Sequence, residues 1–259
     1  MSIRYFTSDF HFGSSVLLDK TAMGKDARPF SDLDSMHLTL QNAMRRAGED
    51  DVLIHLGDLA GIGKDRQWYG LKNESELIQM LKVSPCQKIF IEGNHDEHNA
   101  KIASSAGRLL VDKIGGQHTV TLQHYPSWHS NYCFVNLPTN LKFNGIPTWI
   151  NICGHVHNAW KVYYDYIRHI LNINVGVDRN KFKIYSETEL AALISRAVEY
   201  MKSLENGEHQ SYDEWDKALR RRKADNSRDK LIRSAIYLRD HKPHCLNDRH
   251  RKILESLET

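Results

Sequence analysis

Hydrophobic positions along the chain fall into short runs that polar or amphipathic stretches separate. Six runs have the length and composition of β-strands, at 3–8, 51–56, 88–92, 118–123, 148–153 and 170–177. Amphipathic stretches at 31–48 and 73–83 separate the first three runs, and Ser31 and Asn73 each precede an acidic residue by three positions, as in a capping box. This order predicts an α/β layered fold whose sheets contain both parallel and antiparallel strands.

The clearest helical pattern lies at 186–207. Ser186 and Glu189 have capping-box spacing, one apolar stripe runs from Leu190 to Leu204, and Gly207 marks the end. We therefore predict a main domain over 1–185, a packing helix at 186–207 and a charged, helical C-terminal extension over 208–259.

Composition is typical of a globular protein, since 41% of the 259 residues are hydrophobic. No apolar stretch approaches the roughly 20 residues that cross a bilayer, and the N-terminus leads into a strand without a signal-peptide pattern. We expect a cytoplasmic protein with reduced thiols, because its cysteines have no paired spacing. They are Cys86, Cys133, Cys153 and Cys245.

The net charge of +3 comes from the C-terminal extension. Residues 208–259 contain 13 Lys/Arg and 10 Asp/Glu, whereas 1–207 contain 22 of each. This small excess fits a solvated helix surface as well as a nucleic-acid-binding patch.

Polar side chains follow five successive predicted strands at their carboxyl ends, where α/β folds bind ligands. They are Asp9 and His11, Asp58, Asn94 with His95 and Asp96, His124, and His155 with His157. In an extended chain, residues two apart point to the same side, so Asp9 and His11 could share one ion, and His155 and His157 could share one. Carboxylate, imidazole and amide oxygen suit manganese, iron or zinc. The set is too large for one ion and sufficient for two.

Each of these motifs alone is weak. A single His-x-His is more often structural, and Asn-His-Asp is more often only a turn. The ordered series at successive strand ends is what indicates a site. We expect His55 and His129 to be structural. The tail residues with metal-ligating side chains fit no known metal spacing, and we expect them at the surface: His241, His244, Cys245 and His250.

The ordered series resembles the five motifs of the calcineurin-like metallophosphoesterases over residues 1 to about 180, while the tail after Gly207 is not covered. "RPF" (28–30), "HYP" (124–126) and "NVGVD" (174–178) are similar to a bacterial and phage branch of small members. The resemblance implies a four-layer α-β-β-α sandwich of two mixed sheets, with 1–185 as the catalytic domain. It also implies a metal-dependent phosphoric ester hydrolase.

The resemblance further implies two divalent ions, with Asp58 bridging them. Manganese is the first expectation, with iron, zinc, nickel or magnesium as alternatives. One ion would be held by Asp9, His11, Asp58 and His157, and the other by Asp58, Asn94, His124 and His155. Two ions bring four positive charges and two carboxylates cancel two, so the site would attract phosphate. A metal-bridging hydroxide would attack phosphorus in line, with His95 as proton donor near the leaving group.

Two positions depart from the family patterns. Protein serine/threonine phosphatases have a second aspartate where this chain has Gly61, so that activity is disfavoured. Asp96 is the candidate partner of His95, unless it only shapes the turn. Ser14 stands where close-looking relatives have histidine after "HFG".

We expect the substrate to be a small phosphomonoester or phosphodiester, preferably a nucleotide. Its contacts would be Asn94, His95, Arg28 and Ser14. The segment 12–30 either walls the site, with Lys20, Lys25 or Arg28 meeting phosphate, or is a solvated loop. One alternative is a nuclease that cleaves single-stranded nucleic acid and grips its backbone with 219–223. Another is a non-catalytic scaffold that binds a partner protein.

Overall fold

The computed structural model divides into two compact units, Met1–Asn206 and Gly207–Thr259. It describes 2–61, 70–96, 107–129, 142–143, 146–147, 149–165, 168–205, 211–218, 221, 227, 231–232, 235 and 247–258. Cys133, Cys245, His241, His244 and most of 219–223 lie outside these residues. The predicted packing helix belongs to the first unit.

A four-stranded sheet contains the first three predicted strands, in the order β11-β1-β2-β3. These strands are β1 (Arg4–Thr7), β2 (Val52–Leu56), β3 (Gln87–Ile91) and β11 (Tyr185–Ser186). β1, β2 and β3 are mutually parallel, and β11 is antiparallel to β1. Parallel neighbours need crossover connections, which contain α2 (Leu33–Met44) and α3 (Glu74–Leu81). The predicted alternation of three strands and two helices in this part of the chain is confirmed.

Side-chain caps determine where the two crossover helices begin. Asn73 caps α3 by accepting the Glu76 N–H at 3.2 Å, as predicted. α2 is capped by Asp32, which accepts the Ser35 N–H at 2.7 Å, so its predicted cap at Ser31 is one residue too early. Both helices bury an apolar face against the core of the first sheet, to which Met36, Leu40, Leu77, Leu53 and Phe90 contribute.

The second sheet has five strands in the order β4-β5-β8-β10-β9. They are β4 (Leu109–Ile114), β5 (His118–Gln123), β8 (Trp149–Cys153), β9 (Val162–Asp165) and β10 (Ile170–Asn174). β5, β8 and β10 are parallel, and the edge strands β4 and β9 are antiparallel to their neighbours. β10 ends three residues earlier than predicted, and a 3-10 helix, η3 (Val177–Asn180), follows. A short pair, β6 (Lys142–Phe143) and β7 (Ile146–Pro147), stands apart.

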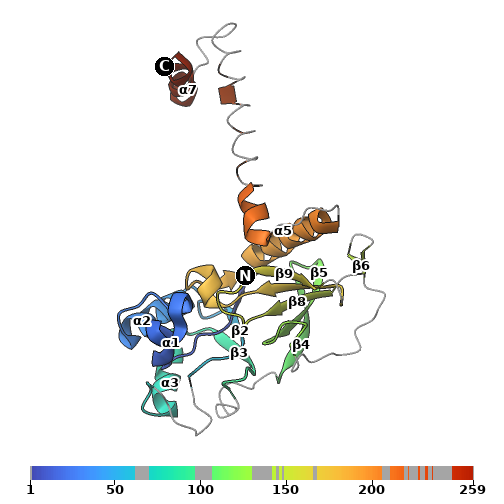
Figure 1. Cartoon of the computed structure of the whole chain (residues 1–259). Helices are drawn as coiled ribbons and strands as arrows, with labels where there is room; N and C mark the ends of the chain where they lie inside the picture. Colours follow the sequence, from blue (N-terminus) through green and yellow to red (C-terminus); the bar gives the residue numbers. More distant parts are fainter. Residues whose placement is uncertain are drawn as a thin grey trace. The chain divides into compact units, whose positions relative to one another are not determined.

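Helix α5 (Glu187–Glu205) packs against strands of both sheets, β1 and β11 of the first and β4 and β10 of the second. Its predicted capping box is present: Ser186 N–H donates to Glu189 at 2.7 Å, and Glu189 N–H donates to Ser186 Oγ at 3.3 Å. The predicted apolar stripe is buried from Leu190 to Leu204. Figure 1 shows two mixed sheets with helices on both sides, so the predicted fold class is confirmed.

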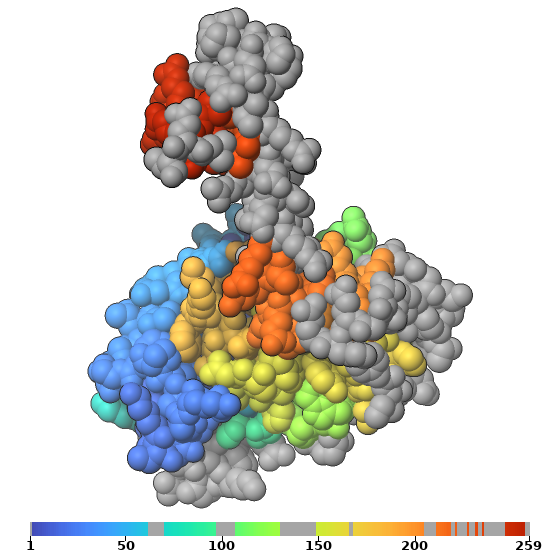
Figure 2. Space-filling view, turned by 45° about the horizontal axis from the view of Figure 1, so that its top comes forward, coloured from blue at the N-terminus to red at the C-terminus, as the bar shows by residue number. Residues whose placement is uncertain are grey.

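Segments distant in sequence lie against one another in the first unit. Figure 2 shows the blue N-terminal part beside the yellow and orange part after residue 150, as the pairing of β1 with β11 requires. The segment 12–30 contains short helical turns, η1 (Ser15–Leu18), α1 (Lys20–Met23) and η2 (Gly24–Asp26).

The C-terminal unit contains α7 (Asp248–Glu258). Cys86 and Cys153 are buried free thiols. Among the described residues, no helix has both the length and the apolar character to cross a membrane.

Candidate metal centre

Backbone hydrogen bonds hold the predicted strand-end loops together. Asp9 N–H donates to Gly57 O at 3.0 Å, which joins the loops after β1 and β2. Gly154 N–H donates to His124 O at 3.0 Å, which joins the loops after β5 and β8. A bridge between Ser8 and Gly176 connects the two sheets. The strand ends therefore meet at one rim.

Five of the predicted ligands have left-handed backbone conformations, with φ of 60° at Asp9, 49° at His11, 57° at Asp58, 71° at His155 and 43° at His157. Such conformations cost non-glycine residues about 1–2 kcal/mol each and concentrate at functional sites. These loops are tightly turned rather than extended, so the premise of the spacing argument is wrong, although Asp9 and His11 do lie in one cluster.

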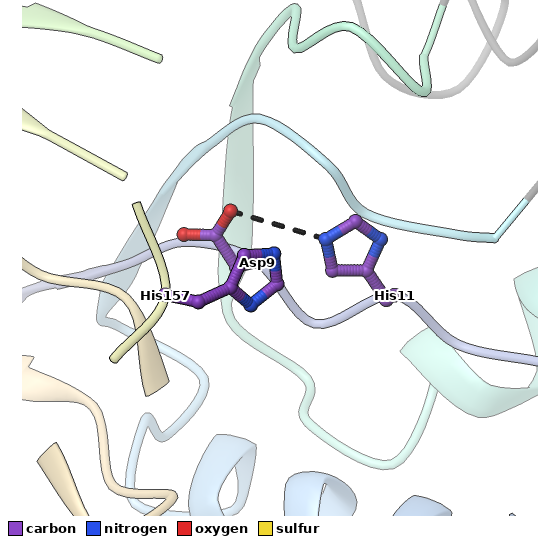
Figure 3. A group of neighbouring side chains, drawn as sticks. All are labelled: Asp9, His11 and His157. Atoms are coloured by element: carbon purple, nitrogen blue, oxygen red, sulfur yellow. Dashed lines mark ion pairs between the residues drawn. The ribbon is translucent and has the colours of Figure 1, made fainter. Parts of the chain in front are cut away.

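The first cluster contains Asp9, His11 and His157, whose ligating atoms lie within 4.8 Å of one another. Figure 3 shows the Asp9 carboxylate and the two imidazoles grouped together, with His11 Nε2 3.9 Å from Asp9 Oδ1. The rings of His11 and His157 are stacked with centroids 5.0 Å apart. His157 Nδ1 donates to Asp178 at 2.9 Å, which leaves Nε2 with its lone pair available.

The second cluster contains Asp58, His124 and His155. The Asn94 side-chain oxygen lies 3.0 Å from both His124 Nε2 and His155 Nδ1. His124 Nδ1 donates to Leu56 O at 2.8 Å, so Nε2 is the nitrogen that faces the cluster. His155 and His157 therefore belong to different clusters, contrary to the expectation from spacing that they could share one ion.

Asp58 lies between the two clusters. Its Oδ2 is 3.4 Å from His11 Nε2 and 3.2 Å from His124 Nε2. His95 joins Asp58 and His11 in a third group of ligating side chains. Its backbone N–H donates to Asp58 Oδ1 at 2.9 Å.

Burial and mutual charge shift the titration of these groups. Burial raises the pKa of Asp9 despite the nearby His157 and His124. Burial would also raise the pKa of Asp58, but His124 and His11 hold it well below its usual range. Burial lowers the pKa of His124, but the Asp58 carboxylate outweighs this effect and raises it to about 9. Burial together with His124 lowers the pKa of His155 to about 4.

Divalent cations fit this arrangement. Among the described residues, the buried His11 Nε2 has no hydrogen-bond partner, and it faces carboxylate oxygens of Asp58 at 3.4 Å and Asp9 at 3.9 Å. In a neutral His124, the Nε2 lone pair faces the oxygens of Asn94 and Asp58. These lone pairs repel one another. A proton or a metal ion bound between them supplies positive charge and removes the repulsion. Neutral imidazoles with carboxylates and an amide oxygen form a ligand set for borderline divalent ions.

Two glycines allow the loops to approach as closely as they do. A Cβ at Gly93 would lie 2.5 Å from the backbone nitrogen of Asp58, and one at Gly154 would overlap Ser8 Oγ and Asp9 Oδ2. Glycine at these two positions therefore lets the loops approach without a side chain between them.

Asp96 holds the loop after β2 and the loop after β3 together. Its buried carboxylate accepts N–H groups from Asp58 at 2.6 Å, Gly93 at 2.9 Å and Leu59 at 3.0 Å. These bonds favour the alternative in which Asp96 shapes the turn.

The departure at Gly61 also has a structural reason. A Cβ at this glycine would lie 2.7 Å from Ser14 Cβ and 2.9 Å from Ser14 Cα. The tight approach of Ser14 leaves no room for the aspartate of the protein phosphatases. Ser14 is half-buried and lies in the segment between β1 and η1.

Arg28 is not placed to meet a substrate. It is 2% exposed, and its guanidinium binds Asp178 and the carbonyl oxygens of Phe10 and Asp9. This burial contradicts the predicted phosphate contact. Lys20 and Lys25 are exposed.

Sequence reasoning missed Asp178, although a signal was present. The sixth predicted strand, 170–177, is followed by this aspartate just as the other five are followed by polar residues. The ring of His129, which we expected to be structural, lies 4.6 Å from that of His155 and stacks on Tyr125. His55 is buried beside Phe10 and Phe90, as expected of a structural histidine.

Comparison with known families agrees with this geometry. The family model described as calcineurin-like phosphoesterase matches residues 5–252. The chain belongs to this family. Membership makes this phosphoesterase a metal-dependent phosphoric ester hydrolase, and its Asp/His clusters are suited to divalent metals. The match extends beyond Gly207, so the expectation that the tail lies outside the resemblance is corrected.

Among solved structures, the phosphoesterase is similar to a protein of unknown function from Aquifex aeolicus. The two are 21% identical, with a TM-score of 0.49, over 74% of this chain and 100% of the other. No curated protein matches significantly.

Proposed function

We propose that this phosphoesterase uses two divalent ions and hydrolyses a small phosphomonoester or phosphodiester, preferably a nucleotide. The observation that carries the proposal is the position of Asp58. A single oxygen of this carboxylate lies 3.4 Å from His11 Nε2 and 3.2 Å from His124 Nε2, which supports a bridging ligand. Paired metal sites recur in enzymes that transfer phosphoryl groups.

The residues that would hold the ions follow from the clusters. One ion would be held by Asp9, His11, Asp58 and His157, and the other by Asp58, Asn94, His124 and His155. When bound, the ions would supply charge for the phosphoryl oxygens and a water of lowered pKa as nucleophile. Manganese is the first expectation, with iron, zinc, nickel or magnesium as alternatives.

His95 is the candidate for proton transfer. Asp58 anchors its backbone, its side chain is exposed at the rim, and its ring lies 5.0 Å from the His11 ring. From there it can contact the phosphate and protonate the leaving oxygen. Asn94 and Ser14 are the further candidate substrate contacts. Asp96 would act indirectly, because its carboxylate fixes the loops that carry Asp58 and His95.

An assay with manganese tests the proposal. It compares an aryl phosphomonoester, the corresponding diester, linear and cyclic nucleotides, and single-stranded nucleic acid. Asp58→Asn should lower hydrolysis by at least about 100-fold, since even residues that only support metal ligands typically cost 10–100-fold. The matched control is Asp165→Asn, because Asp165 is also a buried carboxylate but pairs with Arg168 and belongs to none of the clusters.

The outcomes separate the alternatives. Equal activity in wild type and Asp58→Asn would refute the proposed centre. Cleavage of nucleic acid alone would favour the nuclease. Two bound ions per chain without turnover of any substrate would favour the scaffold.

A further inference from the structure

Two sequence motifs that contribute no residue to the metal clusters are in contact inside the first unit. Arg28 of "RPF" and Asp178 of "NVGVD" are 150 residues apart in sequence. Arg28 Nε lies 2.8 Å from Asp178 Oδ1, and Arg28 Nη2 lies 3.0 Å from Asp178 Oδ2. Their side chains are 1% and 2% exposed. This is a bidentate, buried ion pair, the geometry that fixes both partners most firmly.

Each partner of the pair also holds one side of the first cluster. The guanidinium donates to Asp9 O at 2.6 Å and to Phe10 O at 2.8 Å, which fixes the backbone where Asp9 has its left-handed conformation. Asp178 Oδ2 accepts the His157 Nδ1–H at 2.9 Å. The pair thus connects the loop that carries Asp9 with the side chain of His157.

We propose that Arg28 and Asp178 are positioning residues that orient His157 and the Asp9 loop and so determine the affinity of the Asp9–His11–His157 cluster for its divalent ion. The inference rests on the proposed metal centre, but it does not depend on the substrate. It assigns a role to the two motifs that the ligand sets leave unexplained.

The chemical reason is the orientation of the imidazole. A carboxylate that accepts the Nδ1–H holds the ring in one tautomer and increases the basicity of Nε2, the nitrogen that would bind the metal. The other cluster has a different support, because His124 Nδ1 donates to Leu56 O. Loss of Asp178 should therefore weaken one site selectively.

Calorimetric titration of the metal-free protein with Mn²⁺ tests the selectivity. Asp178→Asn keeps the shape of the side chain. It replaces one acceptor oxygen by an amide N–H donor, which cannot accept the hydrogen bonds of both Arg28 and His157. We expect one ion to bind about 10–100-fold more weakly and the other to bind as in wild type. Equal weakening of both ions, or of neither, would overturn the proposal.

A double-mutant cycle tests whether Asp178 acts through His157. In a His155→Ala background, Asp178→Asn should still weaken the remaining ion 10–100-fold. In a His157→Ala background its effect on metal affinity should be much smaller and limited to what passes through Arg28 and the Asp9 loop. A full effect in the second background would show that Asp178 acts on general stability instead.

Folding is monitored separately by circular dichroism of the metal-free variants. If Asp178→Asn does not fold, the double variant Arg28→Met/Asp178→Leu leaves no unpaired buried charge and should show the same selective loss. Wild-type metal affinity in that variant would overturn the proposal. Asp165→Asn should bind both ions as wild type does. Fewer than two ions in wild type would instead refute the proposed dinuclear centre.

Discussion

At the scale of single residues, glycines and left-handed ligands allow the loops of the rim to touch. Gly93 faces the backbone of Asp58 so closely that no side chain fits between the two loops. The ligands themselves adopt backbone conformations that most residues avoid. The rim is thus held in place by the surrounding packing and hydrogen bonds.

Gly93→Ala should destabilise the protein by about 1–3 kcal/mol, since the added methyl group meets fixed backbone atoms. The control is Gly48→Ala, where a Cβ would make an ordinary contact of 3.6 Å with Asp51. Its effect should stay within about 0.5 kcal/mol. Urea denaturation of the metal-free proteins measures both values, and equal effects would contradict the close-approach argument.

His55 gives a second prediction, for stability against pH. Burial lowers its pKa to about 3, and neither ring nitrogen has a hydrogen-bond partner among the described residues. The unfolded state, with a pKa near 6.5, binds the proton more readily, so stability is full above about pH 7 and falls as pH decreases. At pH 5 this histidine alone should lower the free energy of unfolding by about 2 kcal/mol.

His55→Leu removes this titration. Its unfolding free energy should fall less than that of wild type between pH 8 and pH 5, by the same amount of about 2 kcal/mol. Denaturation curves at the two pH values provide the comparison. Parallel curves for the two proteins would mean that His55 is not buried in its neutral form.

At the scale of elements, the sequence predicts the central strands β2, β5 and β8 better than the edge strands β4 and β9. β2, β5 and β8 are largely buried and have neighbouring strands on both sides, and their predicted positions differ by at most one residue from those observed. β4 and β9 are edge strands with polar positions that solvent tolerates, so their patterns are weak. The side-chain directions at the rim depend on left-handed backbone, which residue spacing does not reveal.

The capping box of α5 can be tested directly. Ser186→Ala should cost about 1 kcal/mol, because the Glu189 N–H loses its acceptor. The matched control in the same helix is Ser195→Ala. Ser195 bonds back to Ala191 O at 3.0 Å, an interaction that adds little, and alanine has the higher helix propensity. Thermal denaturation should separate the two variants, and equal losses would contradict the capping role.

At the scale of the whole molecule, the two units differ in what they contain. The candidate metal ligands of the strand-end loops and the hydrophobic cluster of the first sheet lie in the first unit, whereas the excess positive charge belongs to the second. Composition predicts the charge division, but it cannot assign the second unit a function, because three excess charges suit several roles. The sequence resemblance also stops at about 180, while the family match continues to residue 252.

A chain of residues 1–206 should fold cooperatively and hydrolyse small phosphoesters within about threefold of the full chain. The expectation follows from the hydrophobic cluster of the first sheet, all of whose described residues lie within 1–206. Calorimetry measures folding, and the aryl phosphate assay measures activity. Loss of folding would make the C-terminal unit part of the structural core. Selective loss of nucleic-acid cleavage would assign the basic tail to a nuclease.

The rim joins residues that the ribosome makes at very different times. His155 follows Asp9 by 146 residues, and its backbone N–H donates to the Asp9 carboxylate. At about 5–20 residues per second, synthesis of that interval takes roughly 7–30 s. During this time a nascent chain presents Asp9, His11, Asp58 and Asn94 without their imidazole partners from the second sheet. The Asp9–His11–His157 and Asp58–His124–His155 clusters can therefore be complete only after both sheets have formed, so the proposed two-metal centre would assemble late in synthesis.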